Sequence, residues 1–173
     1  MKLRELTRED CEQMRFWRNE CLETLRTPFK LTLDMQNDFY ENVISNRNSP
    51  HRYWGIYNSD GIHAHLVGVG GITNIQHENS IGEISLIIDP KETGNGFGEN
   101  AAGLLFDQAF NYIGLQTVFG ECYLCNSAHV FWEKTRNKYD GYSVILPNRK
   151  FWNGDYYNSL YFSIDKEKFN ENR

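Results

Sequence analysis

The sequence predicts a single α/β domain spanning residues 1–173, in which helices flank a mixed β-sheet. Three observations lead to this prediction. The length of 173 residues corresponds to one domain that is large enough to bury a substantial core. Short apolar or alternating runs, typical of strands, are interspersed with segments of helical periodicity. A glycine-rich turn at residues 93–98 joins one of the apolar runs to a helix, and no internal repeat, linker or low-complexity tract interrupts the chain.

The first part of the chain predicts one strand followed by two helices. Residues 3–7 alternate in polarity, as a short strand does. Thr7 and Asp10 then resemble a capping box, and Met14 and Trp17 follow at helical spacing. Pro28 breaks this segment, and a second helix is expected from residue 34 to residue 44, before the turn-forming residues 46–50.

The middle of the chain predicts a meander of three strands and a long helix. Residues 53–57 and 66–72 are expected to form antiparallel strands joined by a turn at 58–61, and residues 81–88 complete the meander. The glycine-rich turn then leads into a helix from about residue 98 to residue 112.

The last third predicts a strand, a helix and a hairpin. Residues 117–124 are expected to be a strand, and a helix is expected to begin near residue 126. Residues 149–152 and 155–163 form two aromatic strands around Asn153 and Gly154, and Asn-Gly is the strongest short-range hairpin signal.

Composition and charge exclude several classes of function. The formal net charge is −5, which disfavours nucleic-acid binding through a general basic surface and is compatible with a cationic amine substrate. No apolar run approaches the roughly 20 residues that span a bilayer, so no membrane partner is expected. Residues 1–6 lack the apolar core of a signal peptide, and the expected location is the cytoplasm.

Neither the cysteines nor the histidines predict a metal site. Cys122 and Cys125 form a Cys-x-x-Cys pattern, but residues three apart on a strand point to opposite faces, and no second pair stands at zinc spacing. A structural role is therefore expected for both cysteines. His63, His65 and His77 fall in predicted turns or strand ends and complete no ligand set.

The glycine-rich turn has the chemistry of a phosphate cradle. Gly94, Gly96 and Gly98 let the backbone approach a ligand and present N–H groups to it, and the helix that begins there adds its positive dipole end. A nucleotide P-loop requires Gly-Lys-Ser/Thr, whereas Glu99 follows Gly98 here; the glycine spacing also fails to match a dinucleotide fingerprint.

The turn resembles the pyrophosphate loop of the GNAT superfamily of acyl-CoA-dependent N-acyltransferases, whose motif is Gln/Arg-x-x-Gly-x-Gly/Ala. Gly96-Phe97-Gly98 matches the end of the motif, and Thr93 replaces its Gln or Arg. Asn126 and the aromatic-x-Lys pattern of residues 131–134 resemble the family's features after the fifth strand. The C-terminal hairpin resembles the branch that contains ribosomal-protein N-terminal and nucleotide-amino-sugar acetyltransferases, so the resemblance covers nearly the whole chain.

The resemblance implies a GNAT fold: a mixed, mostly antiparallel seven-stranded sheet with about four flanking helices and splayed strands four and five. It implies acetyl-CoA as the donor, with no metal. The residues expected to bind this donor are Ile87, Ile88, Thr93, Gly94, Asn95, Gly96, Phe97, Gly98, Asn126 and Trp132. Asn126 has a second interpretation, as the N-cap of the following helix, and both are compatible.

Two carboxylates and a tyrosine are the candidate catalytic residues. The thioester is already activated, so the protein must mainly position a neutral amine and accept its proton. Glu83, slightly preferred, and Glu121 are the candidate bases, and either carboxylate has the alternative of merely facing solvent. The family's helix tyrosine is missing near Trp132, so either Tyr139 or Tyr142 replaces it as the acid, or the thiolate leaves unaided because its conjugate acid has a pKa of roughly 8 to 9.

The sequence thus predicts transfer of an acetyl group to a primary amine in a ternary complex. The acceptor is either a small molecule, such as a nucleotide-linked amino sugar, or a protein N-terminus. Arg18, Asn19 and Arg26 resemble a pattern in amino-sugar acetyltransferases, although arginines on helix surfaces are usually solvated. A non-catalytic acyl-CoA-binding protein with a degenerate fold is the alternative, and both monomer and homodimer remain open.

Overall fold

The computed structural model describes residues 1–58 and 64–173, so the predicted turn at 58–61 and His63 lie wholly or partly outside the described residues. The elements follow in the order β1 (Lys2–Arg4), α1 (Arg8–Glu20), η1 (Leu22–Thr24), α2 (Leu33–Phe39) with its π-helical continuation η2 (Tyr40–Ile44), β2 (Arg52–Asn58), β3 (His65–Gln76), β4 (Ile81–Ile88), η3 (Pro90–Glu92), α3 (Phe97–Asp107) with its π-helical continuation η4 (Gln108–Ile113), β5 (Thr117–Tyr123), α4 (Ala128–Lys138), β6 (Tyr142–Trp152), β7 (Asp155–Asp165) and α5 (Lys166–Glu171).

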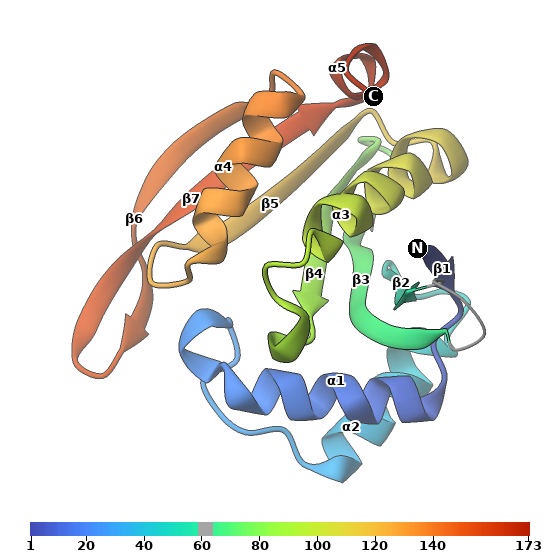
Figure 1. Cartoon of the computed structure of the whole chain (residues 1–173), viewed down its shortest axis with the longest axis vertical. Coiled ribbons are helices and arrows are strands. Elements are labelled where there is room, and N and C mark those ends of the chain that lie inside the picture. The colour runs from blue at the N-terminus through green and yellow to red at the C-terminus, as the bar shows by residue number, and fades with distance from the viewer. Residues whose placement is uncertain (59–63) are drawn as a thin grey trace.

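One seven-stranded sheet runs through the molecule in the order β1-β2-β3-β4-β5-β7-β6 (Figure 1). Neighbouring strands are antiparallel except β4 and β5, which are parallel. The predicted order of strands and helices, and with it the mixed sheet, is confirmed. The short C-terminal helix α5 was not predicted, and β6 begins at Tyr142, well before the predicted residue 149.

The sheet splits between β4 and β5. Their pairing runs only from Ile81 to Glu83 on β4 and from Thr117 to Phe119 on β5. Beyond these residues the strands separate toward their carboxyl ends, as Figure 1 shows. The splay implied by the family resemblance is therefore present, and it opens a fork in the sheet at which the donor and acceptor are expected to meet.

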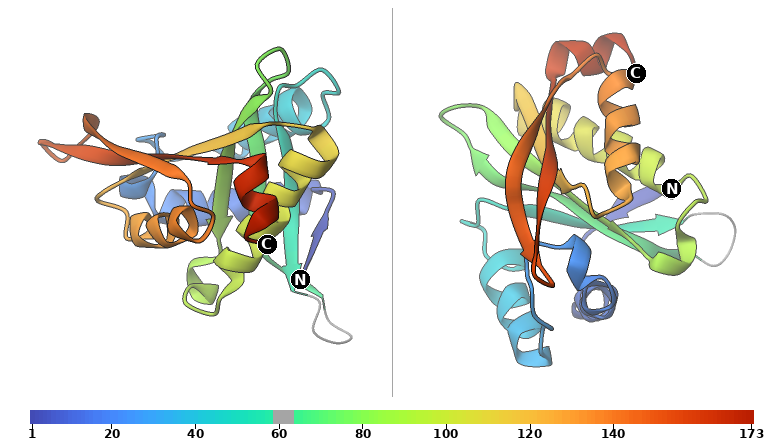
Figure 2. Two further views of the ribbon diagram at one scale, coloured as in Figure 1. Left: turned by 90° about the horizontal axis from the view of Figure 1, so that it is seen from above. Right: turned by 90° about the vertical axis from the view of Figure 1, so that its left-hand side faces the viewer.

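Helices cover both faces of the sheet. The right-hand view of Figure 2 shows α1 and α2 on one side and α3, α4 and α5 on the other. The larger core lies on the second side, where Phe106 of α3 packs against Phe110, Tyr139 and Phe169. Met14 and Trp17 of α1 pack against β3 on the first side. The two layers hold α3 and α1 on opposite sides of the fork.

Local signals in the sequence explain two of the element boundaries. Thr7 accepts a hydrogen bond from the Asp10 N–H and donates its own N–H to the Asp10 carboxylate, so the predicted capping box is confirmed. Asn153 and Gly154 both have positive φ, at 51° and 91°, as a tight hairpin turn requires. The hairpin of β6 and β7 is likewise confirmed.

Candidate active site

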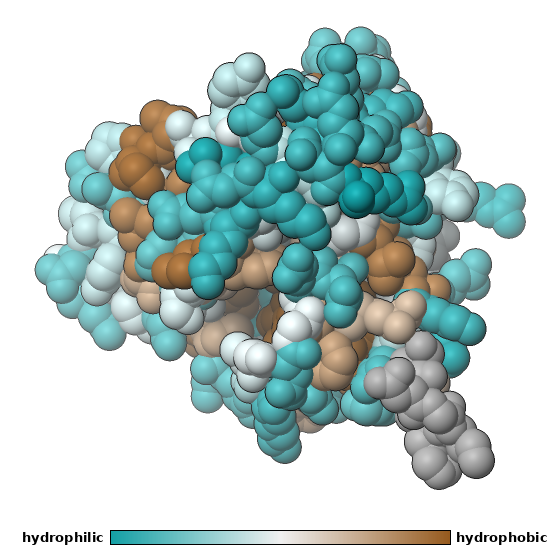
Figure 3. Space-filling view, turned by 45° about the horizontal axis from the view of Figure 1, so that its top comes forward, coloured by the Kyte–Doolittle hydropathy of each residue, from teal (hydrophilic) through white to brown (hydrophobic). Residues whose placement is uncertain are grey.

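A cavity of about 380 Å³ lies at the fork. Its walls come from β4, β5, the last part of α1, and residues 24–27. The surface of the molecule seen in Figure 3 is hydrophilic over most of its area, with hydrophobic side chains in small groups. The cavity at the fork is lined by both polar and apolar side chains, as small-molecule sites commonly are.

Strand geometry brings the two candidate bases to this cavity. Side chains alternate along a strand, so Glu83 shares a face of the sheet with Ser85 and Ile87 of β4. Glu83 pairs in register with Phe119, and Glu121 lies two residues further along β5 on the same face. The cavity is lined by both carboxylates, whose side chains are only 8% and 9% exposed. The structure thus places both predicted bases together.

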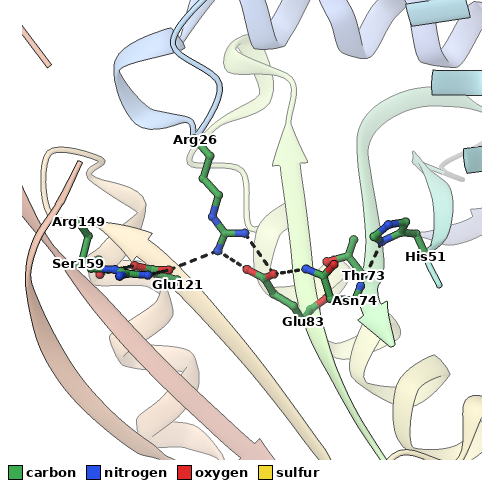
Figure 4. Close-up of polar contacts among 8 residues, drawn as sticks. All are labelled: Arg26, His51, Thr73, Asn74, Glu83, Glu121, Arg149 and Ser159. Carbon is green, nitrogen blue, oxygen red and sulfur yellow. Dashed lines mark hydrogen bonds and ion pairs between the residues drawn. The ribbon is translucent and has the colours of Figure 1, made fainter. Parts of the chain in front are cut away.

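Arg26 bridges the two carboxylates across the fork (Figure 4). Its Nη1 lies 3.2 Å from Glu83 Oε2, and its Nη2 forms a closer contact with Glu83 Oε1. The same Nη2 lies 3.5 Å from Glu121 Oε2. An arginine that sequence reasoning treated mainly as a solvated surface residue is therefore the central cation of the site.

Glu121 is the more heavily bonded carboxylate. Ser159 of β7 donates to Oε1 at 2.7 Å, and Arg149 of β6 donates to the same oxygen through Nε at 2.9 Å. Burial alone would raise the pKa of Glu121, but the hydrogen bonds from Arg149 and Ser159 outweigh it, and the pKa lies below its usual value. Glu121 is accordingly a weak proton acceptor.

Glu83 is held from the opposite side by β3. Asn74 Nδ2 donates to Glu83 Oε2 at 2.9 Å, and the Asn74 N–H donates to His51 Nδ1 at 3.1 Å (Figure 4). Burial and the nearby Arg52 lower the pKa of His51, and an Nδ1 that accepts a hydrogen bond carries no proton. A neutral imidazole therefore borders the cavity beside Glu83 and Asn74.

The glycine-rich turn has an open backbone suited to a pyrophosphate. Gly94 and Gly96 have φ of 88° and 77°, a region that side chains rarely adopt, and a Cβ on either would meet nothing within 4 Å. Gly96 is the N-cap of α3, whose first N–H groups have no partners within the helix. The exposed Thr93, Gly94 and Asn95 precede it, so the turn fits the phosphates of acetyl-CoA.

Of the other residues predicted to bind the donor, Ile87 and Trp132 line the cavity and Ile88 does not. Ile87 lines the cavity, whereas the side chain of Ile88 packs on the other face of the sheet near Phe97. Trp132 lines the cavity and stacks on Phe162 with ring centroids 5.0 Å apart. Contacts with acetyl-CoA remain predictions for all of them.

Asn126 also lines the cavity, at the start of α4. The N-cap of α4 is Ser127, one residue after Asn126, but Asn126 Oδ1 accepts a hydrogen bond from the N–H of Ala128 at 2.9 Å and so still satisfies a free N–H of the first helical turn. This bond uses the side-chain oxygen and leaves the amide group as a donor toward the cavity. Asn126 thus supports the start of the helix from the position before the N-cap, and its contact with the donor stays a prediction.

The candidate acids do not lie at the cavity. Tyr139 is only 5% exposed and packs between Phe106 and Phe169 in the main core. Tyr142 is 70% exposed at the start of β6. The structure therefore gives no support to either tyrosine as the acid, because neither side chain borders the fork.

Sequence reasoning missed a tyrosine that does border the cavity. Tyr123 lies at the end of β5, two residues after Glu121, and so on the same face of the strand. Burial raises the pKa of Tyr123, so its hydroxyl keeps its proton at neutral pH. The alternation of Glu121 and Tyr123 along the predicted strand was the signal that could have found it.

The four cysteines are free, and the structural role of Cys122 and Cys125 stays a prediction. Burial raises the pKa of Cys122, which lines the cavity, to about 12, so the thiol stays protonated. Among residues 1–58 and 64–173, no group of three or more histidine, cysteine, aspartate or glutamate side chains is arranged to hold a metal ion. No helix in the same residues is long and apolar enough to cross a membrane.

A splayed sheet, an open glycine-rich turn at the start of a helix and two carboxylates at the fork are the arrangement expected of an acyltransferase site. The family model of the GNAT acetyltransferase domain matches residues 1–130 of this chain. The chain therefore belongs to the GNAT acetyltransferase family, and it is an acetyl-CoA-dependent N-acetyltransferase that acts on an amine. No curated sequence matches it significantly.

Solved structures share the fold at low sequence identity. A spermidine N-acetyltransferase from Vibrio cholerae in complex with CoA and spermine is 19% identical, with a TM-score of 0.84 over 97% of this chain and 96% of that one. A chimera of the Vibrio cholerae enzyme SpeG and hSSAT is 20% identical, with a TM-score of 0.84 over 99% and 98% of the two chains. At this identity the likeness concerns the fold.

Proposed function

We propose that this protein acetylates the primary amine of a small molecule, with Glu83 as the base. The observation that carries the proposal is the cavity of about 380 Å³ at the fork, which holds two buried carboxylates. Its volume is in the range of small-molecule sites, and Tyr53, Tyr123 and Trp132 give it aromatic walls. An aromatic cavity of this size suits a small acceptor better than a protein N-terminus.

Different residues would bind the acetyl-CoA donor and activate the amine acceptor. Acetyl-CoA supplies an activated thioester, and the turn before α3 would hold its phosphates through backbone N–H groups. Asn74 orients Glu83 toward the cavity, where the carboxylate would accept the proton of the attacking amine. The Tyr123 hydroxyl, protonated at neutral pH, is available as a proton donor to the departing thiolate.

The test is a panel of acceptors assayed by thiol release, with products identified by mass. It contains small primary amines and peptides with free N-termini. Turnover of a small amine that falls sharply in Glu83→Gln supports the proposal. Turnover of peptides alone would reassign the acceptor to a protein N-terminus.

A further inference from the structure

The acceptor side of the cavity has one cation without a carboxylate partner. Of the arginines that line it, Arg26 pairs with both Glu83 and Glu121. Arg18 of α1 lines the same cavity, and no carboxylate of the described residues lies within ion-pair distance of it. Its Nη2 donates to the hydroxyl of Thr27 at 3.2 Å, and its buried Nε has no hydrogen-bond partner among these residues. A half-buried guanidinium that lines the cavity without a carboxylate partner is suited to an anion.

A second cavity extends this positive region. It has a volume of about 300 Å³ and shares His51 and Tyr53 with the first cavity. Its lining includes Arg47 and Arg52, and none of the described residues that line it is acidic. Arg52 donates to backbone carbonyls of residues 47, 49 and 51, which are neutral, so its charge is not cancelled there.

Tyr53 lines the same cavity as the two carboxylates and Arg18. It lines both cavities, and burial raises the pKa of its hydroxyl while the neighbouring charges of Arg18 and Glu83 act on it in opposite directions. Arg18, Tyr53 and Glu83 line the same cavity, so one small acceptor there has both a carboxylate and an arginine within the walls that surround it.

From this charge arrangement we propose that the acceptor carries an anionic group, a phosphate or a carboxylate, in addition to its amine, and that Arg18 binds that group. The inference rests on the proposed function, because it places the amine at Glu83. A polyamine such as the spermine bound in the neighbouring structure carries no anionic group that could pair with Arg18. The shared fold therefore serves a different class of acceptor here.

The anion site is tested by binding, independently of turnover. Protein saturated with CoA, so that the phosphate-binding turn is filled, is titrated with inorganic phosphate and, separately, with acetate. We expect one of the two anions to bind, and Arg18→Gln to weaken that binding about tenfold or more, because a charge-assisted hydrogen bond is lost. Arg8→Gln on the same helix is the control, since Arg8 is exposed and pairs with Glu41 away from the cavity. Equal anion binding by the wild type and Arg18→Gln, or none by the wild type, overturns the proposal.

Kinetics with matched acceptors give the second readout. Ethanolamine, phosphoethanolamine, β-alanine and spermidine are compared by KM and kcat. The proposal expects the lowest KM for the phosphate or the carboxylate compound, and expects Arg18→Gln to remove that advantage through KM with little change in kcat. Spermidine as the preferred acceptor contradicts it. If none of the amines is acetylated while Arg18-dependent anion binding persists, the proposed function fails and the anion site stands.

Discussion

Glu83 and Glu121 are the same residue type in the same cavity, and their different partners separate their roles. Glu121 accepts hydrogen bonds from Arg149, Ser159 and Arg26, which occupy both of its oxygens and hold its pKa below the usual value. Glu83 is bound by Arg26 and by the neutral amide of Asn74. The arginine partners of both carboxylates are about half exposed, Arg26 at 53% and Arg149 at 49%, but Glu121 also accepts a hydrogen bond from the fully buried Ser159, which holds it in place. Glu83 is therefore the better candidate for the base.

Replacing Glu83 with glutamine tests this assignment. The amide keeps the shape of the carboxylate but cannot accept the amine proton, so we expect kcat to fall about 100-fold. The KM for acetyl-CoA should stay the same because the phosphate-binding turn is not altered. Steady-state kinetics by thiol release measure both quantities, with Glu121→Gln as the comparison. Wild-type turnover in Glu83→Gln would transfer the role to Glu121 or to solvent.

The substitution Tyr139→Phe tests whether Tyr139 is the general acid that protonates the departing thiolate. The Tyr139 ring packs against Phe106 and Phe169, and phenylalanine keeps that packing. Since the hydroxyl does not border the fork, we expect kcat to stay within about twofold of the wild type. Tyr123→Phe, assayed beside it, removes the hydroxyl that does line the cavity. A large loss of turnover in Tyr139→Phe, with unchanged thermal stability, would restore Tyr139 as the acid.

The turn before α3 is the proposed binding site for the phosphates of the donor, and this role belongs to the turn as a whole element. Its function depends on open backbone N–H groups and on the helix dipole, so a carboxylate placed there should repel pyrophosphate. In Gly96→Asp the new side chain enters open space, although the positive φ of 77° costs about 1 kcal/mol for a residue other than glycine. Calorimetric titration with acetyl-CoA should show binding abolished in Gly96→Asp.

Gly96→Asn is the matched control for this prediction. It has the same size and the same backbone cost without the charge, and asparagine tolerates the left-handed region. We expect Gly96→Asn to keep most of the affinity and to unfold at nearly the same temperature as Gly96→Asp. Unchanged acetyl-CoA affinity in Gly96→Asp would contradict the role of the turn.

Elements with a strong local signal were predictable from the sequence. The capping box of Thr7 and Asp10, the Asn153-Gly154 turn and the glycine-rich turn each depend on neighbouring residues, and each is present. The role of Arg26 was not predictable in the same way, because its partners Glu83 and Glu121 lie 57 and 95 positions further along the chain. Long-range side-chain pairs of this kind depend on the fold as a whole, and so do the hydrogen bonds from Arg149 and Ser159 to Glu121.

In the whole molecule, a polar network crosses the gap that the backbone leaves open. Past Glu83 and Phe119, β4 and β5 no longer pair, so backbone hydrogen bonds cannot hold the two halves of the sheet together there. Arg26 joins Glu83 of β4 to Glu121 of β5, and Arg149 and Ser159 connect Glu121 to β6 and β7. Figure 4 shows this chain of contacts across the fork. The charge of Glu121 therefore links the N-terminal and C-terminal parts of the protein.

The network predicts a specific acid dependence of stability. The pKa of Glu121 is lower in the folded protein than its ordinary value of 4.5, so the ionised carboxylate stabilises the fold above that pH. This contribution is lost as the pH falls from about 4.5 through the folded pKa, because the unfolded chain takes up the proton first.

Urea unfolding of the wild type between pH 7 and pH 3 should therefore show a steep loss of unfolding free energy below pH 4.5. In Glu121→Gln the free energy should be lower at pH 7 and should fall less steeply in that window. Glu20→Gln, which removes an exposed carboxylate outside the network, should follow the wild type. Parallel curves for the wild type and Glu121→Gln would show that Glu121 does not hold the two sides of the fork together through its charge.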